Sequence, residues 1–510
     1  MEEKCVKSAV YNLETVFKDS AEVPVDIDFT LPDYCPEISR ILKCRTAARI
    51  SSKSVEGQRI SLEGSVTLTV IYADNENTVN SYEYQYPFSK TFEAGTDLSG
   101  AYVRVRLKTE YINCRPVTER KIDIHGAIGV YVTASSRKIR DIICDVEDEN
   151  IEVLRVSAPA TMPVGNADKY VLIEDEIEVG SSKPDIRCLI RYDSSVRIEE
   201  CKLLDKKAIA KGEMSVNILY RGEGGELESL EGSIPFSQLV DIEGAGEDCE
   251  CRISADVAYL EVKPKANSSS AARAFSVDGK ILLTAEAYKS RDIDVVTDAY
   301  STMYEANVSG EEICFNRLVC NINDTFNCRK ELDFPSGSIE RVYDVWCIPG
   351  ESSTEFEGDC LTVSGNAVCG ILALNEEGAP VYYEKPVEFD YRYKMSCPTD
   401  NLSVQPEISV ISTGYTISGD SRLEIRLEMA VNAAVYECSE INLVNNISID
   451  ENKPISKSDS AALTVYFAES GENVWEIARR YLANTDEIRR LNELDGDQLT
   501  QTKMLLIPTK

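Results

Sequence analysis

The sequence predicts a mainly β protein, in which three tandem antiparallel β-sandwich-like repeats precede a small βααβ module. Three observations lead to this prediction. The chain of 510 residues repeats itself, first at an offset of 148 residues and again at 301. Within each repeat apolar residues alternate with polar ones, which is typical of a strand with one buried face. Near the C-terminus the apolar spacing changes to that of helices.

The first two repeats align without a gap over a long span. Gly64 and Tyr72 correspond to Gly212 and Tyr220. The other matched residues are Pro36, Glu37, Ile38, Pro87, Phe88 and Ser89, which correspond to Pro184, Asp185, Ile186, Pro235, Phe236 and Ser237. Self-similarity of this kind is the signature of tandem structural units.

The third repeat is more diverged. Its matched residues are Ile339, Arg341 and Gly365, at the positions of Ile38, Arg40 and Gly64. We therefore expect repeats of ordinary domain size and a separate terminal module. The expected units are repeats over 1–150, 151–305 and 306–450, a flexible linker over 451–461 and the module over 462–510.

Alternating segments recur at matched places in the repeats. They run over 60–72, 208–220 and 361–373, over 122–132, 275–285 and 423–435, and over 103–107 and 253–259. Short strands separated by polar turns favour a sandwich or open barrel. Gly64, Gly212 and Gly365 stand in mid-strand, where we expect a bulge or a close backbone approach. Residues 1–20 are interpreted as a short helix.

The terminal module is predicted to be strand, helix, helix, strand. Asn473 is positioned to cap the first helix, with Glu476 as its capping-box partner. The second helix is expected to begin at Thr485. The strands are expected over 463–467 and 504–507. Val465, Ile477 and Leu491 are assigned to the core of the module.

Charge and cysteine content indicate the environment of the protein. The chain has 87 acidic and 54 basic residues, for a net charge of -33, so it repels nucleic acid and anionic membranes. The 17 cysteines are odd in number, which favours reduced structural thiols over a disulfide framework. Residues 1–20 lack the apolar run of a secretory signal, so we expect a cytoplasmic protein without membrane insertion.

Catalytic motifs are scarce in this sequence. His125 is the only histidine, and its alternating segment predicts that it faces outward. The sequence has neither a GxxxxGK[ST] phosphate loop nor a GxGxxG motif. We therefore expect no enzyme, no catalytic residue, no cofactor and no metal.

The repeat motifs resemble a known domain. They comprise Pro32-Asp33, Pro36-Glu37-Ile38, Leu62-Glu63-Gly64, Ile71-Tyr72 and Pro87-Phe88-Ser89, with counterparts in the second repeat. This pattern resembles the SPOCS domain of sporulating clostridia, and the resemblance is weaker over 315–450.

The terminal module resembles a LysM domain. The matching residues are Val465-Tyr466, Gly471, Val474-Trp475, Ile477-Ala478, Tyr481, Ile488, Leu491-Asn492, Leu499 and Leu505-Leu506-Ile507-Pro508. LysM modules usually bind N-acetylglucosamine polymers in a groove between two loops. The resemblance places this groove at Gly471, Glu472, Asn473, Val474, Asn492, Glu493, Leu494 and Asp495. Glu472-Asn473 replaces the common Asp-Thr, and Glu493 replaces a common proline.

The order of SPOCS repeats followed by one LysM module resembles the SipL-like family of clostridial spore coat morphogenetic proteins. The resemblance implies that the LysM module binds stage IV sporulation protein A, the ATPase of the coat basement. It also implies residence in the mother-cell cytoplasm at the forespore surface. The SPOCS repeats would bind other coat proteins or associate with one another. The alternative is a peptidoglycan- or N-acetylglucosamine-binding protein of the cell wall or cortex.

Five residues of the module are candidates for contact with a protein partner. Trp475 is the first, since large aromatic residues dominate binding hot spots; ordinary packing within the module is an equal alternative. The others are Arg479, Arg480, Arg489 and Arg490, the main basic pairs of the module. Arginine is enriched at interfaces, although solvated helix faces would explain them as well.

Overall fold

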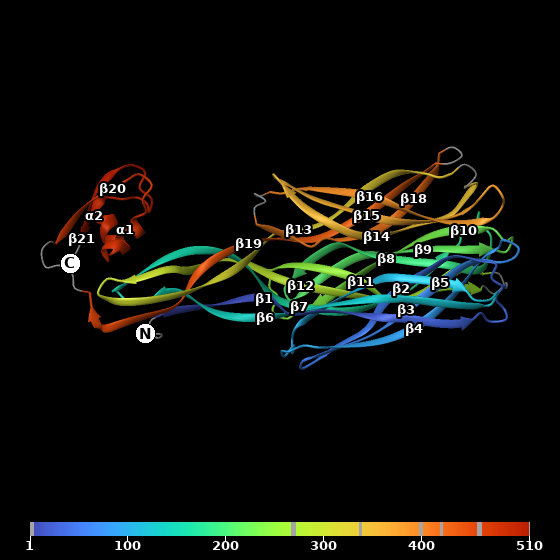
Figure 1. The fold of residues 1–510 in the computed structure, drawn as a ribbon, viewed down its shortest axis with the longest axis horizontal. Coiled ribbons are helices and arrows are strands. Elements are labelled where there is room, and N and C mark those ends of the chain that lie inside the picture. The colour runs from blue at the N-terminus through green and yellow to red at the C-terminus, as the bar shows by residue number, and fades with distance from the viewer. Residues whose placement is uncertain are drawn as a thin grey trace.

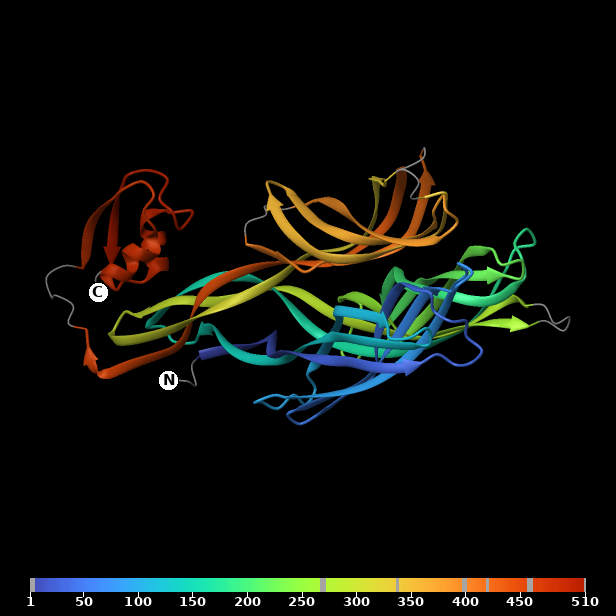
Figure 2. The same ribbon diagram turned by 45° about the vertical axis from the view of Figure 1, so that its right-hand side comes forward.

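Most of the chain is described by a computed structural model, which covers residues 5–266, 272–335, 339–396, 401–418, 422–455 and 462–508. The molecule is elongated. A β-rich head lies at one end, a stalk of long strands extends from it, and the C-terminal module lies beside the far end of the stalk (Figures 1 and 2).

Each repeat contributes a set of antiparallel strands. The first repeat contains β1 (Cys5–Thr30), β2 (Arg40–Glu56), β3 (Arg59–Ala73), β4 (Val79–Glu93), β5 (Tyr102–Pro116) and β6 (Lys121–Val146). The second contains β7 (Ile151–Glu178), β8 (Ile186–Leu204), β9 (Lys207–Gly222), β10 (Leu227–Asp241), β11 (Glu250–Ala266) and β12 (Ala272–Ser301). The third contains β13 (Tyr304–Asp333), β14 (Arg341–Glu357), β15 (Cys360–Leu374), β16 (Pro380–Lys394), β17 (Leu402–Val404), β18 (Glu407–Ile417) and β19 (Arg422–Pro454).

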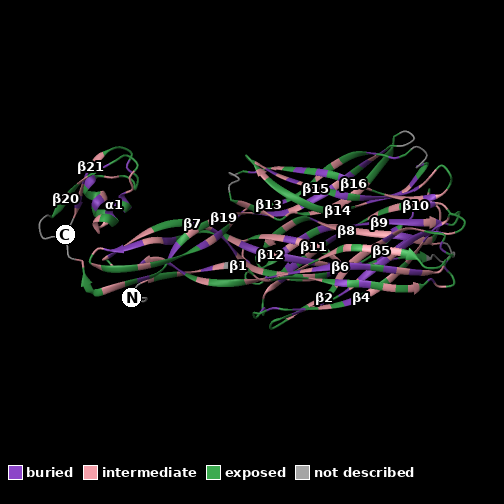
Figure 3. Cartoon of the chain, viewed as in Figure 1, coloured by how far each residue is buried: buried purple, intermediate pink, exposed green. Residues whose placement is uncertain are grey.

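The sheets follow one plan in all three repeats. The first repeat has the sheets β1–β6–β5 and β2–β3–β4, and the second has β7–β12–β11 and β8–β9–β10, joined by one bridge between Ala272 and Ile186. In the third, β14–β15–β16 faces a sheet in which β19 pairs with β13, β17 and β18. Buried residues alternate with exposed ones along the strands (Figure 3). The prediction of a mainly β, sandwich-like fold is confirmed.

The mid-strand glycines lie directly under aromatic rings. In each repeat the glycine pairs across the sheet with the phenylalanine of the following strand: Gly64 with Phe88, Gly212 with Phe236, and Gly365 with Phe389. A Cβ atom added at these glycines would lie 2.6–2.8 Å from the phenylalanine Cζ atom. The added Cβ atom would also lie 2.2–3.0 Å from a backbone carbonyl oxygen of the preceding strand, so the predicted close backbone approach is confirmed. The predicted bulge is present as well, because the register of β2, β8 and β14 shifts beside these glycines. The ring contact explains why glycine and phenylalanine recur together in the repeats.

The first and last long strands of each repeat form the stalk. These strands, β1 with β6, β7 with β12 and β13 with β19, are 26 to 33 residues long and continue well past the head. The prediction of a helix over 1–20 is wrong, because residues 5–20 belong to β1 and pair with β6. Tertiary pairing here overrides a weak local preference. The linker predicted over 451–461 overlaps β19, which continues through Pro454, and residues 456–461 lie outside the described residues.

Each of these strand pairs forms one arm of the stalk. The three arms pack on each other through matched apolar residues. Val10, Ala158 and Ile313 come from the first strand of each arm, and Ile142, Val295 and Leu443 from the second. All six belong to one buried cluster. Since each arm is only a two-stranded ribbon, which is marginally stable alone in water, this shared core holds the stalk together.

The repeats also meet at equivalent positions in the head. Ile71, Leu219 and Leu372, which are related by the repeat offsets, are fully buried in one cluster with Trp346. The contacts close a ring. Arg40 of the first repeat donates to the Pro380 carbonyl of the third, Arg221 of the second donates to Val79 of the first at 3.1 Å, and Arg341 of the third lies 3.6 Å from Glu228 of the second.

Charged residues lie at the centre of this ring, where Arg191 and Asp344 are buried and Arg45 and Asp193 are half-buried. Arg191 Nε donates to Asp344 Oδ2 at 2.7 Å, and Arg45 Nη2 donates to Asp193 Oδ1 at 2.7 Å. The guanidinium groups of Arg45 and Arg191 lie 5.0 and 4.6 Å from the ring centroid of Trp346. Burial alone would raise the pKa of Asp193, but the charges of Arg45 and Arg191 outweigh it and hold that pKa below the ordinary value. The network therefore links all three repeats.

Two disulfides contradict the prediction of reduced cysteines. Cys314 is bonded to Cys438 and joins β13 to β19, and Cys347 is bonded to Cys369 and joins β14 to β15. Cys347 and Cys369 are direct partners in the strand register, a proximity that the sequence does not reveal. The buried Cys35 and Cys44 lie outside these disulfides. The odd total therefore does not exclude individual disulfides.

The glycine–phenylalanine contact predicts a stability difference within one repeat. We expect Gly212→Ala to lower the free energy of unfolding of the second repeat by about 1–3 kcal/mol, because its Cβ atom would overlap Arg197 O and Phe236. Gly180→Ala is the control, since nothing lies within 4 Å of an added Cβ atom there. Urea unfolding followed by circular dichroism measures both. Equal stability of the two variants would contradict the proposed role of Gly212.

Candidate functional site

The C-terminal module has the predicted βααβ order. It consists of β20 (Leu463–Ala468), α1 (Val474–Tyr481), α2 (Thr485–Asn492) and β21 (Lys503–Pro508), with β20 and β21 paired antiparallel. Asn473 caps α1 by accepting from the Trp475 backbone N–H at 2.8 Å. Asn484 caps α2 in the same way through the Glu487 N–H. These caps satisfy N–H groups that have no partner within the helix.

The core of the module agrees only partly with the prediction. Ile477 is buried, as predicted. The prediction is wrong for Val465 and Leu491, which are 51% and 45% exposed. In β20 the residues at even positions face the helices, and Tyr466 lies beside Tyr481 with ring centroids 5.8 Å apart. Val465 therefore points to the other side of the strand pair.

That outer side forms an apolar sheet face. Its large exposed residues are Leu463, Val465 and Phe467 of β20 and Met504 of β21. Phe467 is 72% exposed and pairs in register with Met504. The alternation of apolar residues at 463, 465 and 467 was visible in the sequence. Period-two alternation does not say which side of a strand is covered, which is why the assignment of Val465 to the core is wrong.

Trp475 packs against the stalk of its own chain. Its side chain is only 6% exposed. Its ring centroid lies 5.0 Å from that of Tyr300 in β12, and its Nε1 donates to Asp298 Oδ2 at 2.9 Å. Arg479 donates to the same carboxylate oxygen at 2.6 Å. Two of the five candidate contact residues thus hold the module to the stalk.

A second set of contacts fixes the start of α2. Tyr300 Oη donates to the Ala483 carbonyl at 2.7 Å. Glu152 of β7 accepts from Asn484 Nδ2 at 2.6 Å and from the Thr485 backbone N–H at 3.2 Å. A carboxylate at a helix N-terminus is stabilised by the helix dipole. We call the contacts of Glu152, Asp298 and Tyr300 with the module the docking contact.

The remaining candidate arginines differ in how closely they are paired and in how far they are exposed. Arg480 donates to Tyr466 Oη at 3.0 Å, and Arg489 donates to Asp486 at 2.8 Å and also pairs with Asp497. Arg490 lies 3.8 Å from Glu487, and its side chain is 78% exposed. Arg490 is therefore more accessible than Trp475, Arg479 and Arg489.

The loops of the glycan groove are bonded to each other. Gly471 N–H donates to Leu499 O at 2.7 Å, Val474 N–H to Asp497 O at 2.8 Å, and Leu499 N–H to Glu472 O at 3.0 Å. The buried amide of Asn492 donates to Ile488 O and Leu506 O and accepts from Leu506 N. Of the groove residues, Gly471, Glu493 and Asp495 are exposed, Glu472, Asn473 and Leu494 are half-buried, and Val474 and Asn492 are buried.

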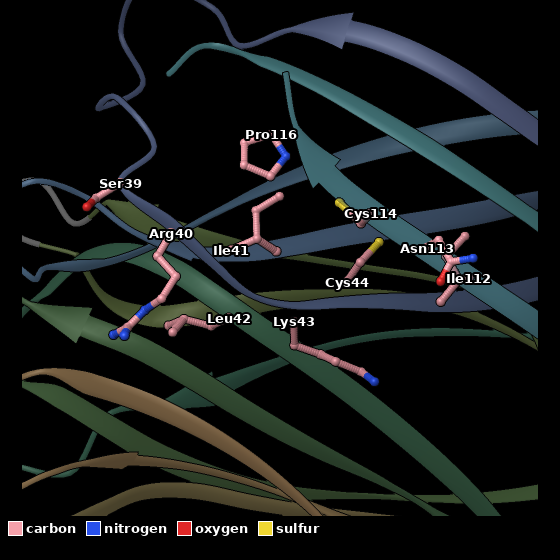
Figure 4. A pocket seen from close by; sticks show the side chains of 10 residues that line it. All are labelled: Ser39, Arg40, Ile41, Leu42, Lys43, Cys44, Ile112, Asn113, Cys114 and Pro116. Carbon is pink, nitrogen blue, oxygen red and sulfur yellow. The ribbon is translucent and has the colours of Figure 1, made fainter. Parts of the chain in front are cut away.

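The side chains with catalytic potential are in close contact with neighbouring side chains. His125 is exposed between Asp26, at 2.8 Å, and Asp123, at 3.0 Å. Cys44 and Cys114 turn toward one another in a cavity of about 500 Å³ in the first repeat (Figure 4). The hydrogen bond with Cys44 and burial raise the pKa of Cys114 and keep its thiol protonated, which makes it a poor nucleophile. Within the described residues, no three His, Cys, Asp or Glu side chains gather to hold a metal.

Comparison with known families gives two matches. Residues 37–117 and 185–265 match the SipL, SPOCS domain, and residues 468–508 match the LysM domain. No curated protein matches the chain. Both matched domains are non-catalytic binding modules. Among the described helices, none has the length and apolar character needed to cross a membrane.

The docking contact predicts how the module is released. We expect the double variant Asp298→Ala, Tyr300→Ala to free the module, because it removes the ring contact and the acceptor of both Trp475 and Arg479. Tryptophan fluorescence should shift to the red, and proteolysis between β19 and β20 should accelerate. Asp294→Ala, at an exposed position of the same strand, is the control. Unchanged fluorescence in the double variant would show that Trp475 is buried by other contacts.

His125 offers a test of pH dependence. The hydrogen bond to Asp26 and the charge of Asp123 raise the pKa of His125 above 6.5. The protonated ring therefore stabilises the β1–β6 pairing below pH 6.5, and this contribution is lost as the pH rises through the folded-state pKa. Proton NMR should show a raised pKa that falls in Asp26→Asn. An unchanged pKa in this variant would contradict the contact.

Proposed function

We propose that this chain, with its SipL-like architecture of SPOCS domains followed by a LysM domain, is a non-enzymatic adaptor in spore coat morphogenesis. Its LysM domain binds stage IV sporulation protein A, and its β repeats mediate further assembly at the forespore surface in the mother-cell cytoplasm. The domain matches themselves indicate a sporulation-related protein with a peptidoglycan-binding module. The observation that carries the finer proposal is the apolar sheet face of the module.

The apolar sheet face has the character of a protein-binding surface. Four large apolar side chains lie together on two paired strands and are about half or more exposed. Contiguous apolar surface on a soluble domain marks interaction sites, and a flat sheet face suits a protein better than a sugar chain. Arg490 adds an accessible charge on the same small module. Burying Phe467 and Met504 against a partner would remove apolar surface from water.

Trp475, Arg479, Arg480, Arg489 and Arg490 remain the second part of the proposed partner surface. Trp475 becomes available only when the docking contact opens, whereas Arg479 is 55% exposed but pairs with Asp298 until then. A partner that uses Trp475 must compete with Tyr300 and Asp298, which lowers its apparent affinity by the fraction of free module. The stalk therefore acts as a restraint on this part of the surface.

The alternative is glycan binding in the LysM groove. The family match over 468–508 favours it. The three backbone bonds between the groove loops engage groups of Gly471, Val474 and Glu472, so these groups are not free to bond a sugar. The exposed Glu493 and Asp495 add no donor when ionised. These features favour a protein partner over a glycan.

The binding surface is tested by capture of purified stage IV sporulation protein A on the immobilised full-length chain. We expect Phe467→Asp to weaken capture at least about tenfold, because it places a charge at the centre of the apolar sheet face. Leu172→Asp is the matched control, since Leu172 of β7 is 73% exposed but lies on a repeat. Equal loss in both variants, or in neither, would reject the apolar sheet face as the contact.

A second measurement tests whether the partner also uses the surface around Trp475, and whether the module binds a glycan instead. If the partner uses Trp475, we expect Asp298→Ala, Tyr300→Ala to raise capture and Trp475→Glu to abolish this gain. N-acetylglucosamine hexamer is titrated into the same proteins. Binding of the hexamer without capture of the protein would overturn the adaptor proposal in favour of the glycan-binding alternative.

A further inference from the structure

A cavity of about 740 Å³ lies where the three arms of the stalk join the head. All three repeats line it at equivalent positions: Thr133 and Ser135 of β6, Glu286 and Tyr288 of β12, and Ala434 and Tyr436 of β19. Each arm has a β-bulge at this level, between Thr15 and Phe17, Ala287 and Tyr288, and Leu318 and Cys320. Bulges bend strands and often lie beside functional sites. The volume is in the range of small-molecule sites.

The charge of this junction cavity is opposite to that of the whole protein. Four cationic side chains line it, Lys18, Arg104, Arg137 and Arg252, against the single carboxylate of Glu286. Glu407 also approaches two of the arginines. A chain with a net charge of -33 would not be expected to gather cations at one place without a structural or binding reason.

The central arginines are incompletely paired. Arg104 lies 3.6 Å from Glu286 and 3.9 Å from Glu407, and Arg252 Nη2 lies 3.6 Å from Glu407, so none of these ion pairs is a direct hydrogen bond. Arg252 donates through Nε to Asn432 Oδ1 at 3.1 Å. Its buried Nη2 atom has no hydrogen-bond acceptor. A buried donor without an acceptor is costly, and an anion in the cavity would supply one.

Hydroxyl groups complete the lining. Tyr102 and Tyr288 line the cavity, and Tyr288 Oη donates to Glu286 Oε2 at 2.8 Å. Burial, the largest effect, and the charge of Glu286 raise the pKa of Tyr102 to about 12. Tyr102 thus stays a protonated donor. Arginine and neutral hydroxyl donors together are the groups that bind carboxylate and phosphate oxygens.

We propose that the junction cavity binds a small polyanion that carries two or more carboxylate or phosphate groups, through the guanidinium groups of Arg104 and Arg252. Such a ligand bridges Arg104 of the first repeat and Arg252 of the second in a cavity that the third repeat also lines. It binds the assembled junction more tightly than separated repeats and therefore stabilises the arrangement of the arms. This site is separate from the LysM surface, so it does not depend on the proposed function.

Titration calorimetry on the full-length chain tests the cavity, with citrate and pyrophosphate as probes at constant ionic strength. We expect saturable binding of one anion per chain by at least one probe. A response to citrate alone identifies a carboxylate ligand, and a response to pyrophosphate alone identifies a phosphate ligand. Sodium chloride at the same ionic strength is the reference.

Two variants with opposite expected effects guard against simple misfolding. Arg252→Met keeps the aliphatic stem but removes the charge, and should weaken binding at least about tenfold. Glu286→Gln removes the repelling carboxylate while keeping an acceptor for Tyr288, and should tighten binding about threefold. Arg59→Met, at an exposed ion pair of the β3–β4 hairpin, should change nothing. Absence of binding by both probes, or affinity that neither cavity variant alters, would overturn the proposal.

Discussion

The arrangement of the whole molecule depends on the contact among the three repeats at the centre of the head. There, Arg191 bonds Asp344, Arg45 bonds Asp193, and both guanidinium groups lie against Trp346. Removal of one partner from a buried ion pair is strongly destabilising, because the remaining charge has lost its water and its counterion. Arg45 lies on β2 of the first repeat, Arg191 and Asp193 on β8 of the second, and Asp344 and Trp346 on β14 of the third, so the network specifies which repeat lies beside which.

This closed ring determines the direction of the arms. Because the repeats share one plan of sheets, a ring of repeats sends three equivalent ribbons out from the head on the same side. The ribbons then bury Val10, Ala158 and Ile313 and their partners against each other. The junction cavity lies at the level where the bulges occur. The stalk in turn presents Tyr300, Asp298 and Glu152 to the C-terminal module.

The module consequently has one surface that the stalk covers and one that is exposed. The side with Trp475 and Arg479 is occupied by the stalk, whereas the apolar sheet face is open. A protein partner can thus bind without disturbing the docking contact, or can replace it. The presence of two disulfides within the third repeat adds covalent links between neighbouring strands there. The more diverged third repeat thus keeps the common architecture with additional cross-links.

The sequence by itself determined the strands of the head, the mid-strand position of the three glycines and the βααβ order of the module. These features depend on alternation, spacing and capping residues, which are local properties of the chain. Only the tertiary structure decided that residues 5–20 form a strand, that Val465 faces outward and that Trp475 packs on the stalk. The reason is physical: a strand edge or an aromatic side chain is covered by whatever segment lies opposite, and Trp475 bonds a carboxylate 177 residues away in the chain. Residues Cys347 and Cys369 show the same limit, since the register of two strands brought their sulfur atoms together.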